Sequence, residues 1–220
     1  MEIAGTRIDG AIFDLDGVIV DTAKYHYLAW KELASELGFA FTRQDNELLK
    51  GVSRERSLEI LLELGGVILS AEDFQKALVR KNARYVEYID RMDASEILPG
   101  VCDFLVALRK AGIRIALGSA SKNTPLILQR VGLCDAFDAV VDGNMVSRAK
   151  PDPEVFLVGA RRLCVPPCNC VVFEDSQAGI DAAGRAGMRS VGIGSSDVLM
   201  NADMVVAGFS GSVLFFGLDS

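Results

Sequence analysis

Short apolar runs recur along most of the chain, and several of them end directly in acidic or small polar residues. Short hydrophobic runs bounded by turn residues are typical of strands that are buried on both faces of a sheet. The apolar positions therefore predict strands at 8–13, 113–117, 139–141, 171–173, 190–193 and 204–206.

The segments between these strands carry helical patterns of apolar residues. Strands that alternate with helices favour a parallel sheet covered by helices on both faces, so we expect an α/β fold with a Rossmann-like core. In such sheets, ligands bind beyond the carboxyl ends of the strands. The expected helices span 101–111, 123–131, 153–164 and 178–186.

The alternation stops between about residues 22 and 95, where the pattern indicates helices only. The sequence thus predicts a catalytic core of residues 1–21 and 96–220, and an all-helical cap domain of residues 22–95 inserted between the first two strands. Ser70 and Asp73 form a weak capping box before the last cap helix. The expected cap helices span 23–37, 45–49, 53–64 and 71–90.

Composition and charge narrow the range of functions. Half of the 220 residues are hydrophobic, which is enough for a packed core, and the net charge is −7. Nucleic-acid binding needs a basic footprint, whereas a phosphorylated small molecule can bind wherever local cations or a metal reverse the sign. No apolar run is long enough to span a membrane, and no signal-peptide pattern is visible. We expect a soluble, cytoplasmic protein.

The five cysteines are an odd number, as expected for the reduced thiols of an intracellular protein. Cys164, Cys168 and Cys170 cluster in the sequence, which raises the question of a zinc site. No nearby histidine or fourth cysteine completes a tetrahedral set of ligands. Free thiols that flank a strand are therefore the favoured interpretation.

Two carboxylates, Asp14 and Asp16, follow the first long strand and precede Gly17. Positions two apart on an extended backbone project to the same side, so the two groups repel unless a cation or a proton intervenes. One can then stay ionised as a nucleophile or ligand while the other holds a proton for acid–base chemistry. Taken alone, such a motif is more often an ordinary acidic turn.

Three later strand ends favour the chemical interpretation. Glu174 and Asp175 add two carboxylates, and with Asp14 they form an oxygen-only set suited to Mg²⁺. Ser119 lies in a turn of small residues, where a hydroxyl and backbone N–H groups can hold a phosphoryl oxygen. Lys150 can supply a fixed cation, although a lysine alone is more often a solvated surface residue. We therefore expect a magnesium-dependent phosphoryl transfer.

The order of these motifs, Phe-Asp-x-Asp-Gly, a serine turn, a lysine and Glu-Asp, resembles the haloacid dehalogenase superfamily of phosphohydrolases and phosphotransferases. The resemblance covers nearly the whole chain. It implies that Asp14 attacks phosphorus to form an aspartyl phosphate and that Asp16 is the general acid and base. The implied Mg²⁺ ligands are Asp14, the Asp16 carbonyl, Glu174 and Asp175, and the implied phosphoryl-binding residues are Ser119 and Lys150.

Longer segments are similar to one family of that superfamily, the β-phosphoglucomutases, which interconvert β-D-glucose 1-phosphate and D-glucose 6-phosphate. The similarity extends over both the core and the insert, and it is more specific than the superfamily signature. The matching segments are 14–22 with 25–26 and 29–31, 49–54 with Ser57, 80–82, 119–123 and 174–180.

A mutase of this kind must bind a sugar bisphosphate, β-glucose 1,6-bisphosphate as its priming intermediate, in two orientations. It therefore needs a second phosphate site that faces the first. Arg54 on the cap offers a forked, permanently charged group, and Ser121, Lys122 and Asn123 supply donors from the core. Closure of the cap would assemble the site and exclude water from the aspartyl phosphate.

The resemblance implies roles for further residues. His26, the single histidine, and Lys81 would couple cap closure to the acid–base position of Asp16, and Thr22 would belong to the hinge. Without the resemblance, a single histidine is more often a satisfied surface or core residue, and Trp30 is equally an expected part of the cap core. The other implied substrate-binding positions are Trp30, Lys50, Gly51, Val52, Ser53, Ser57, Asn82 and Ala120.

Three functions remain open: a β-phosphoglucomutase, a sugar-phosphate phosphatase that releases the phosphoryl group to water, and a catalytically silent sugar-phosphate-binding protein. The intact carboxylates disfavour the third, because binding alone needs no nucleophile. Arg54, His26 and the 121–123 segment favour the first over the second. We expect sugar phosphates as partners, no nucleic acid or membrane, and a monomer, because the cap must open and close.

Overall fold

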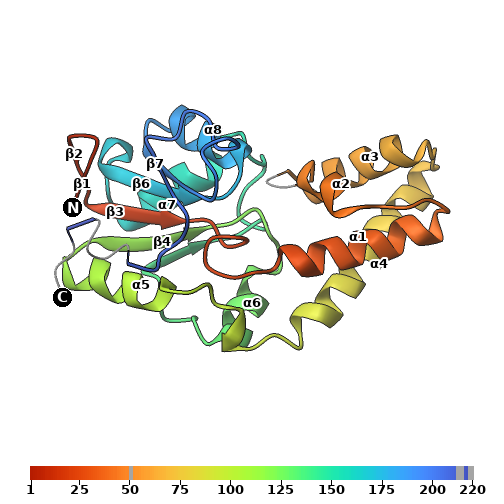
Figure 1. The fold of residues 1–220 in the computed structure, drawn as a ribbon, viewed down its shortest axis with the longest axis horizontal. Coiled ribbons are helices and arrows are strands. Elements are labelled where there is room, and N and C mark those ends of the chain that lie inside the picture. Colours follow the sequence, from red (N-terminus) through yellow and green to blue (C-terminus); the bar gives the residue numbers. More distant parts are fainter. Residues whose placement is uncertain (50–51, 212–215, 218–220) are drawn as a thin grey trace.

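The computed structural model describes residues 1–49, 52–211 and 216–217. This part of the chain forms two lobes, a sheet flanked by helices and a group of helices to one side of it (Figure 1). The expected α/β architecture with a helical insert is confirmed. In the described residues, the sheet has six parallel strands: β3 (Gly10–Phe13), β4 (Arg114–Gly118), β5 (Ala139–Val141), β6 (Cys170–Glu174), β7 (Arg189–Ile193) and β8 (Met204–Val206).

Strand β3 lies inside the sheet, whose order is β5-β4-β3-β6-β7-β8. It pairs with β4 on one side and with β6 on the other, so that Phe13 lies opposite both Leu117 and Phe173. The strand order reverses at this point, and the loops after β3, β4 and β6 surround one crevice. Asp14, the residue after Phe13, is therefore placed where sheets of this kind bind ligands.

Helices cover both faces of the sheet because successive side chains of a strand point in opposite directions. Phe13 packs into a cluster with α5 and α6, whereas Ile12 packs into another with α7 and α8. All residues of β3 and β6 are buried, which explains why the strands are visible in the sequence as continuous apolar runs. The covering helices are α5 (Val101–Lys110), α6 (Thr124–Val131), α7 (Glu154–Leu163) and α8 (Gln177–Arg185), and 3-10 turns occur at η1 (Ala94–Glu96) and η2 (Pro167–Asn169).

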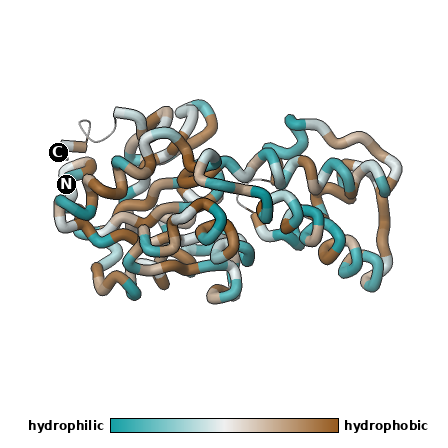
Figure 2. Tube along the Cα trace, turned by 90° about the horizontal axis from the view of Figure 1, so that it is seen from below, coloured by the Kyte–Doolittle hydropathy of each residue, from teal (hydrophilic) through white to brown (hydrophobic). Residues whose placement is uncertain are grey.

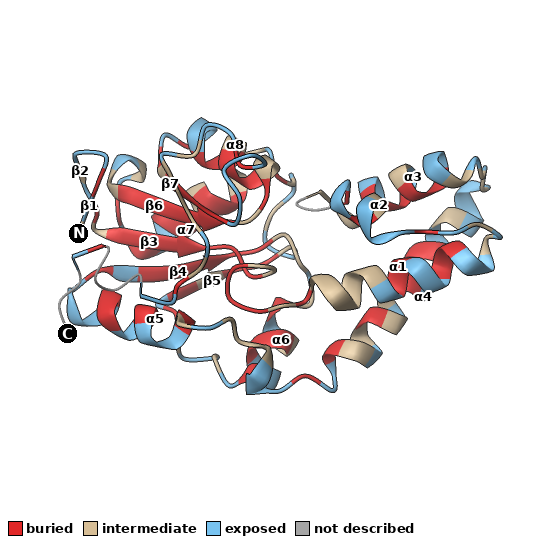
Figure 3. Ribbon diagram, viewed as in Figure 1, coloured by how far each residue is buried: buried red, intermediate tan, exposed pale blue. Residues whose placement is uncertain are grey.

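The helical lobe has an apolar cluster of its own, which Figure 3 shows as buried positions in the lobe away from the sheet. Trp30 and Leu33 of the first helix meet Leu58 and Leu61 of the third in this cluster. A separate core is the mark of a domain, although the boundaries at residues 22 and 95 stay a prediction. The helices are α1 (Ala23–Glu36), α2 (Arg43–Glu47), α3 (Arg54–Gly65) and α4 (Ala71–Ile89).

Side-chain caps set the first residues of three of these helices, with Ser53 before α3 among them. The Ser70 hydroxyl accepts a hydrogen bond from the Asp73 N–H at 3.1 Å and donates one to Asp73 Oδ2 at 2.7 Å, so one half of the expected capping box is present. Before α2, Thr42 and Asp45 form a reciprocal capping box, with Thr42 N–H to Asp45 Oδ2 at 2.8 Å and Asp45 N–H to Thr42 Oγ1 at 3.2 Å. Helix α2 therefore begins at Arg43, two residues before the expected start; the other expected strands and helices agree within two residues at each end.

The two connections between the lobes run side by side. Val20 and Ile97 form an antiparallel bridge, the Asp21 N–H donates to the Glu96 carbonyl at 3.0 Å, and the Leu98 N–H donates to the Ile19 carbonyl at 2.9 Å. The chain thus leaves the core and returns to it through one hydrogen-bonded pair of segments. Figure 2, seen from below, shows how narrow this junction is compared with either lobe.

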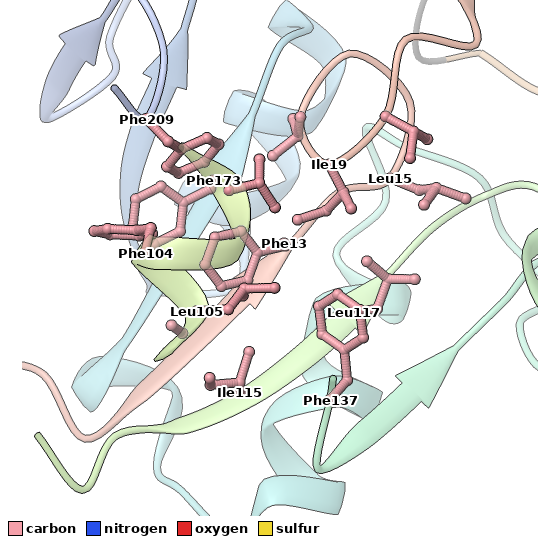
Figure 4. Close-up of a cluster of buried hydrophobic side chains, with 14 of the residues drawn as sticks. Phe13, Leu15, Ile19, Phe104, Leu105, Ile115, Leu117, Phe137, Phe173 and Phe209 are labelled. Atoms are coloured by element: carbon pink, nitrogen blue, oxygen red, sulfur yellow. The ribbon is translucent and has the colours of Figure 1, made fainter. Parts of the chain in front are cut away.

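Two terminal features were not predicted. Strands β1 (Glu2–Ile3) and β2 (Thr6–Arg7) form a small hairpin whose turn residues, Ala4 and Gly5, have positive φ. At the other end, Phe209 packs among the rings of Phe13, Phe104 and Phe173, with centroid distances of 5.0–6.0 Å (Figure 4). Phe209, in the segment after β8, therefore helps to close the core beside β3.

The aromatic cluster makes a prediction about stability. Phe209→Ala should lower the free energy of unfolding by about 3–5 kcal/mol, because it leaves a cavity among Phe13, Phe104 and Phe173. Urea unfolding followed by circular dichroism measures this loss. Val198→Ala, at a site that is 60% exposed, is the control and should change the free energy by less than about 0.5 kcal/mol. Equal stabilities of the two variants would contradict the packing of the tail.

Candidate active site

A cavity of about 480 Å³ lies where the carboxyl ends of the strands face the helical lobe. This volume is in the range of about 300–1,000 Å³ that is usual for small-molecule sites. Both lobes contribute to its wall. The lining residues from the strand ends include Asp14, Asp16, Ala120, Ser121, Lys122, Asn123, Lys150 and Asp175, and those from the helical lobe include His26, Trp30, Asn46, Val52, Ser53, Arg54, Ser57, Lys81 and Tyr85.

Lys150 connects the acidic residues of two strands. Its buried Nζ donates to Asp14 Oδ1 at 2.6 Å and to Glu174 Oε2 at 2.8 Å. Burial by itself would lower the pKa of this lysine, but the two carboxylates and their hydrogen bonds raise the pKa above its ordinary value. The ammonium group therefore stays charged and neutralises part of the negative charge at the strand ends. The peptide bond from Lys150 to Pro151 is cis.

Glu174 is held from the opposite side by the start of α8. Its Oε1 accepts hydrogen bonds from the Ser176 hydroxyl at 2.6 Å and from the Ser176 N–H at 3.2 Å. Gly179 lies directly behind the carboxyl group, because a Cβ at this position would be only 2.0 Å from the Glu174 Cδ. Burial and the nearby charge of Asp14 raise the pKa of Glu174 to about 7, while Lys150 and the hydrogen bonds oppose this shift.

Asp14, Glu174 and Asp175 bring carboxylate oxygens to within 4.8 Å of one another. Gly17 makes room for one of them, since a Cβ there would be 2.1 Å from Asp175 Oδ2. An all-oxygen group of this kind fits Mg²⁺, which binds carboxylates and keeps positions for water and phosphate oxygens. The donor set thus agrees with the expected ion, and the Asp16 carbonyl as a further ligand stays a prediction.

The Asp16 side chain has a different environment from that of Asp14. It accepts a hydrogen bond from the hydroxyl of Thr22, which is fully buried at the first residue before α1. Burial and the Asp14 charge raise the pKa of Asp16 to about 6, and the Thr22 hydrogen bond partly opposes them. A carboxyl group with such a pKa can hold or release a proton near neutral pH, whereas Asp14 is paired with Lys150.

His26 and Lys81 form a polar pair on the helical side of the cavity. Lys81 Nζ donates to His26 Nδ1 at 2.9 Å and lies over the rings of Trp30 and Tyr85, at 4.5 and 4.8 Å from their centroids. Burial and the charges of Lys81 and Arg54 lower the pKa of His26 well below its usual value. The ring is therefore neutral, and its Nδ1 can accept the hydrogen bond from Lys81. Burial and Arg54 also lower the pKa of Lys81, to about 7.

A second cationic group lies across the cavity from the strand ends. Arg54 is the first residue of α3, after the N-cap Ser53, and burial lowers the pKa of its guanidinium. The segment before α6 is held in place by hydrogen bonds, with Ser121 N–H to Ser119 Oγ at 3.0 Å and Asn123 N–H to Ser121 Oγ at 3.2 Å. The cavity wall thus includes Arg54 and the segment 121–123 in addition to the residues around Asp14.

Most of the predicted site residues line this one cavity. Thr22, Ser119 and Glu174 are buried just behind its wall and contact residues that line it, and Asn82 accepts a hydrogen bond from Asn123 at 3.1 Å, which links the two lobes. Lys50 and Gly51, also predicted to bind substrate, lie outside the described residues.

Several lining residues were not predicted from the sequence, among them Asn46, Tyr85 and Arg148. Tyr85 could have been found, because it is one helical turn after Lys81 and therefore on the same face of α4. Asn46 and Arg148 carry no comparable signal, since their position depends on how a short helix and a loop fold back toward the strand ends.

Comparisons with known proteins agree with this geometry. Residues 8–187 match the family model described as a haloacid dehalogenase-like hydrolase. The chain is 45% identical to the β-phosphoglucomutase of Bacillus subtilis, over 89% of this chain and 87% of that protein. It is 33% identical to the phosphorylated carbohydrates phosphatase of Thermotoga maritima, with 84% of each chain covered. A crystal structure of β-phosphoglucomutase from Clostridium difficile superposes with a TM-score of 0.89 at 41% identity, covering 96% of this chain and 97% of that one.

The contact between Gly179 and Glu174 predicts a selective loss of metal binding. In Gly179→Ala, the new methyl group would overlap the Glu174 carboxyl group and displace it. We expect Mg²⁺ affinity, measured by isothermal titration calorimetry, to fall by about 10- to 100-fold, as is usual when the support of a metal ligand is removed.

Gly184→Ala is the matched control, because Gly184 lies in the same helix and a Cβ at this position would have nothing within 4 Å. Alanine is favoured over glycine inside a helix by about 0.5–1 kcal/mol, so this variant should melt at the same or a higher temperature and bind Mg²⁺ normally. Equal Mg²⁺ affinity in both variants would contradict the proposed packing of Glu174.

Proposed function

The chain belongs to the haloacid dehalogenase-like hydrolase family, and we propose that within it the protein is a β-phosphoglucomutase. It would interconvert β-D-glucose 1-phosphate and D-glucose 6-phosphate through an aspartyl phosphate and β-glucose 1,6-bisphosphate. The observation that supports the proposal is the presence, in the wall of one cavity, of two groups of polar and cationic residues, each of which would bind a phosphate. One surrounds Asp14, and the other is formed by Arg54 and residues 121–123.

The first half of the reaction transfers the phosphoryl group from Asp14 to the sugar. Asp16 takes the proton from the 6-hydroxyl of β-glucose 1-phosphate while that oxygen forms a bond to phosphorus, and the bond from phosphorus to the Asp14 carboxylate breaks. The pKa of Asp16, raised to about 6, suits a group that must both accept and return a proton. The product is the bisphosphate.

In the second half, the bisphosphate binds in the reversed orientation. The Asp14 carboxylate attacks the phosphorus of the 1-phosphate, the bond from phosphorus to the sugar oxygen breaks, and Asp16 returns its proton to that oxygen. Glucose 6-phosphate is released and the aspartyl phosphate is regenerated. A site that must accept both orientations needs a phosphate-binding group at each end, which a simple hydrolase does not.

Asp14, the Asp16 carbonyl, Glu174 and Asp175 would hold one Mg²⁺, which neutralises charge on the phosphoryl oxygens when bound. Lys150 would bind the same phosphoryl group from the other side, since its Nζ already lies 2.6 Å from Asp14 Oδ1. Loss of one such charge-stabilising group costs about 3–4 kcal/mol of transition-state stabilisation. The residues Ser119 and Ala120, at the end of β4, would supply further donors there.

The helical lobe would act as the cap over this site, with the domain boundaries proposed at residues 22 and 95. Thr22, at the junction, already hydrogen-bonds Asp16, and His26 follows it one turn later in α1. Lys81 and His26 would therefore move with the cap toward Asp16 and couple closure to proton transfer. Trp30, Lys50, Gly51, Val52, Ser53, Ser57 and Asn82 would form the rest of the substrate wall.

A monomer in the cytoplasm is our proposal for the form in which it works, since one chain contains every residue invoked above. Of the helices in the described residues, none is both long and apolar enough to cross a membrane. The second candidate function is a sugar-phosphate phosphatase, which the similarity to the Thermotoga maritima enzyme favours. The two differ only in whether water or sugar receives the phosphoryl group.

Product analysis distinguishes these functions. The protein is incubated with Mg²⁺, β-glucose 1-phosphate and a trace of β-glucose 1,6-bisphosphate, and glucose 6-phosphate and free phosphate are measured together. We expect rapid formation of glucose 6-phosphate with little free phosphate, because the sugar competes with water inside a closed cap. Mostly free phosphate would favour the phosphatase, and no turnover of any sugar phosphate would leave a binding function.

Arg54→Ala tests the second phosphate site. Mutase kcat/KM should fall by about 10- to 100-fold, the usual worth of a charge-assisted hydrogen bond, whereas hydrolysis of acetyl phosphate should change little, because acetyl phosphate has no second phosphate. Arg56→Ala is the control, since Arg56 lies two residues along α3 and pairs only with Glu59 and Glu63 among the ion pairs of the described residues. Equal losses on both substrates would rule out a distal phosphate contact.

A further inference from the structure

Four side chains on two neighbouring helices form a small group in the wall of the cavity. His26 and Trp30 lie one turn apart on α1, and Lys81 and Tyr85 lie one turn apart on α4. All four line the cavity. The contacts run between the helices, since Lys81 meets both residues of α1 and Tyr85 meets His26.

Lys81 is a buried cation that has no carboxylate partner. It is 2% exposed, and none of the ion pairs between described residues includes it. An ammonium group that is removed from water in this way is costly unless other groups replace the water. The replacements are His26 Nδ1, at 2.9 Å, and the faces of two rings, whose centroids lie 4.5 Å (Trp30) and 4.8 Å (Tyr85) from Nζ.

Tyr85 supports both members of the pair that His26 and Lys81 form. Its ring centroid is 4.1 Å from that of His26, with an angle of 35° between the ring planes. The face of the same ring is occupied by the Lys81 ammonium group. Both contacts involve the ring of Tyr85, so the aromatic group itself is what the pair rests on.

Tyr85 is anchored outside the apolar cluster of the helical lobe. It is 1% exposed and belongs to the large cluster of the core lobe, together with Val18, Ile19 and Val20, which lead from the sheet toward the cap. Trp30 belongs instead to the cluster inside the helical lobe. Because closely packed side chains keep one orientation, the position of the Tyr85 ring is fixed from the junction between the lobes.

We propose that Tyr85 is a positioning residue, whose ring holds the imidazole of His26 and the ammonium group of Lys81 in one arrangement at the cavity wall. The proposal rests on the proposed function for the roles of His26 and Lys81, and it adds the residue that keeps them in place. Small displacements of groups that act on a bound substrate are costly in rate, so the loss of this support should be visible in turnover.

The kinetic test compares wild type with Tyr85→Phe, which keeps the ring, and Tyr85→Leu, which removes it. The assay contains Mg²⁺, β-glucose 1-phosphate and a trace of β-glucose 1,6-bisphosphate. In Tyr85→Leu, kcat should fall by about tenfold, the worth of a desolvated contact between a cation and a ring, with little change in KM. Tyr85→Phe should keep kcat within about twofold of wild type, because a phenylalanine ring can make the same contacts.

A second measurement reports on the arrangement itself. His26 is the single histidine of the chain, so nitrogen NMR of its ring needs no assignment. Because Nδ1 accepts the hydrogen bond from Lys81, the ring proton of wild type should lie on Nε2 and the two nitrogens should give well-separated resonances. These resonances should move toward each other in Tyr85→Leu, since a less restrained ring exchanges between its tautomers. A change in stability alone would not shift them in the folded protein.

Tyr88→Leu is the matched control, because it removes the same ring from the same helix. Tyr88 stacks on Tyr25, and its hydroxyl donates to Glu32. This variant should keep the kcat and the His26 resonances of wild type. Should Tyr85→Leu fail to fold, Tyr85→Met, whose long flexible side chain fills much of the same space, replaces it with the same expectations.

Several outcomes would overturn the proposal. Wild-type kcat or unchanged His26 resonances in Tyr85→Leu would show that the ring holds nothing in place, and equal losses in Tyr85→Phe would assign the role to the hydroxyl. Equal losses in Tyr88→Leu, or failure of both Tyr85→Leu and Tyr85→Met to fold, would make the effect one of general structure.

The mutase proposal is judged separately, by formation of glucose 6-phosphate in wild type. If free phosphate is the product instead, kcat is measured as phosphate release. The NMR comparison requires no turnover, so the role of Tyr85 can be tested whichever way that assay ends.

Discussion

The site depends on the repulsion between carboxylates that the fold forces together at the ends of β3 and β6. Asp14, Glu174 and Asp175 have oxygens within 4.8 Å of one another, and burial makes such proximity costly without compensating positive charge. Lys150 supplies one charge through two short contacts, and the oxygen-rich remainder suits a divalent ion. A phosphoryl group, itself an anion, can then bind where an acidic protein with a net charge of −7 would otherwise repel it.

The helical lobe carries the complementary charge. Burial, together with the charge of Arg54, lowers the pKa of Lys81 to about 7. Like charges held together in a partly closed cavity are stabilised by an anion between them, so a sugar phosphate relieves an unfavourable interaction that the empty lobe retains. Each lobe is therefore electrostatically incomplete by itself, in opposite senses: the strand ends need a cation, and the helical lobe needs an anion.

The sequence predicted the sheet well, because strands buried on both faces are short apolar runs that end in polar or turn residues. The residues at their ends were found for the same reason, since parallel strands bring Asp14, Ser119 and Glu174 to one edge whatever the loops do. The hairpin of β1 and β2 was not predicted, because strands of two residues are too short to show an alternation of apolar and polar positions. The pairing of His26 with Lys81 came only from resemblance, because 55 residues separate them and only packing of α1 on α4 joins them. The position of Asn46 in the cavity wall depends on how helix α2 packs toward the strand ends, which no local sequence pattern indicates.

The two neighbouring segments that join the lobes have a mechanical consequence. Residues 19–21 and 96–98 are hydrogen-bonded to each other, so we expect the two segments to bend together and not to slide past one another. A cap joined to the core by two segments that do not contact each other would be able to approach the sheet in more orientations. If the cap closes as we propose, the guanidinium of Arg54 would travel along nearly the same arc each time. The length of the helical lobe would then set the spacing between the two proposed phosphate sites, and with it the size of sugar that spans them.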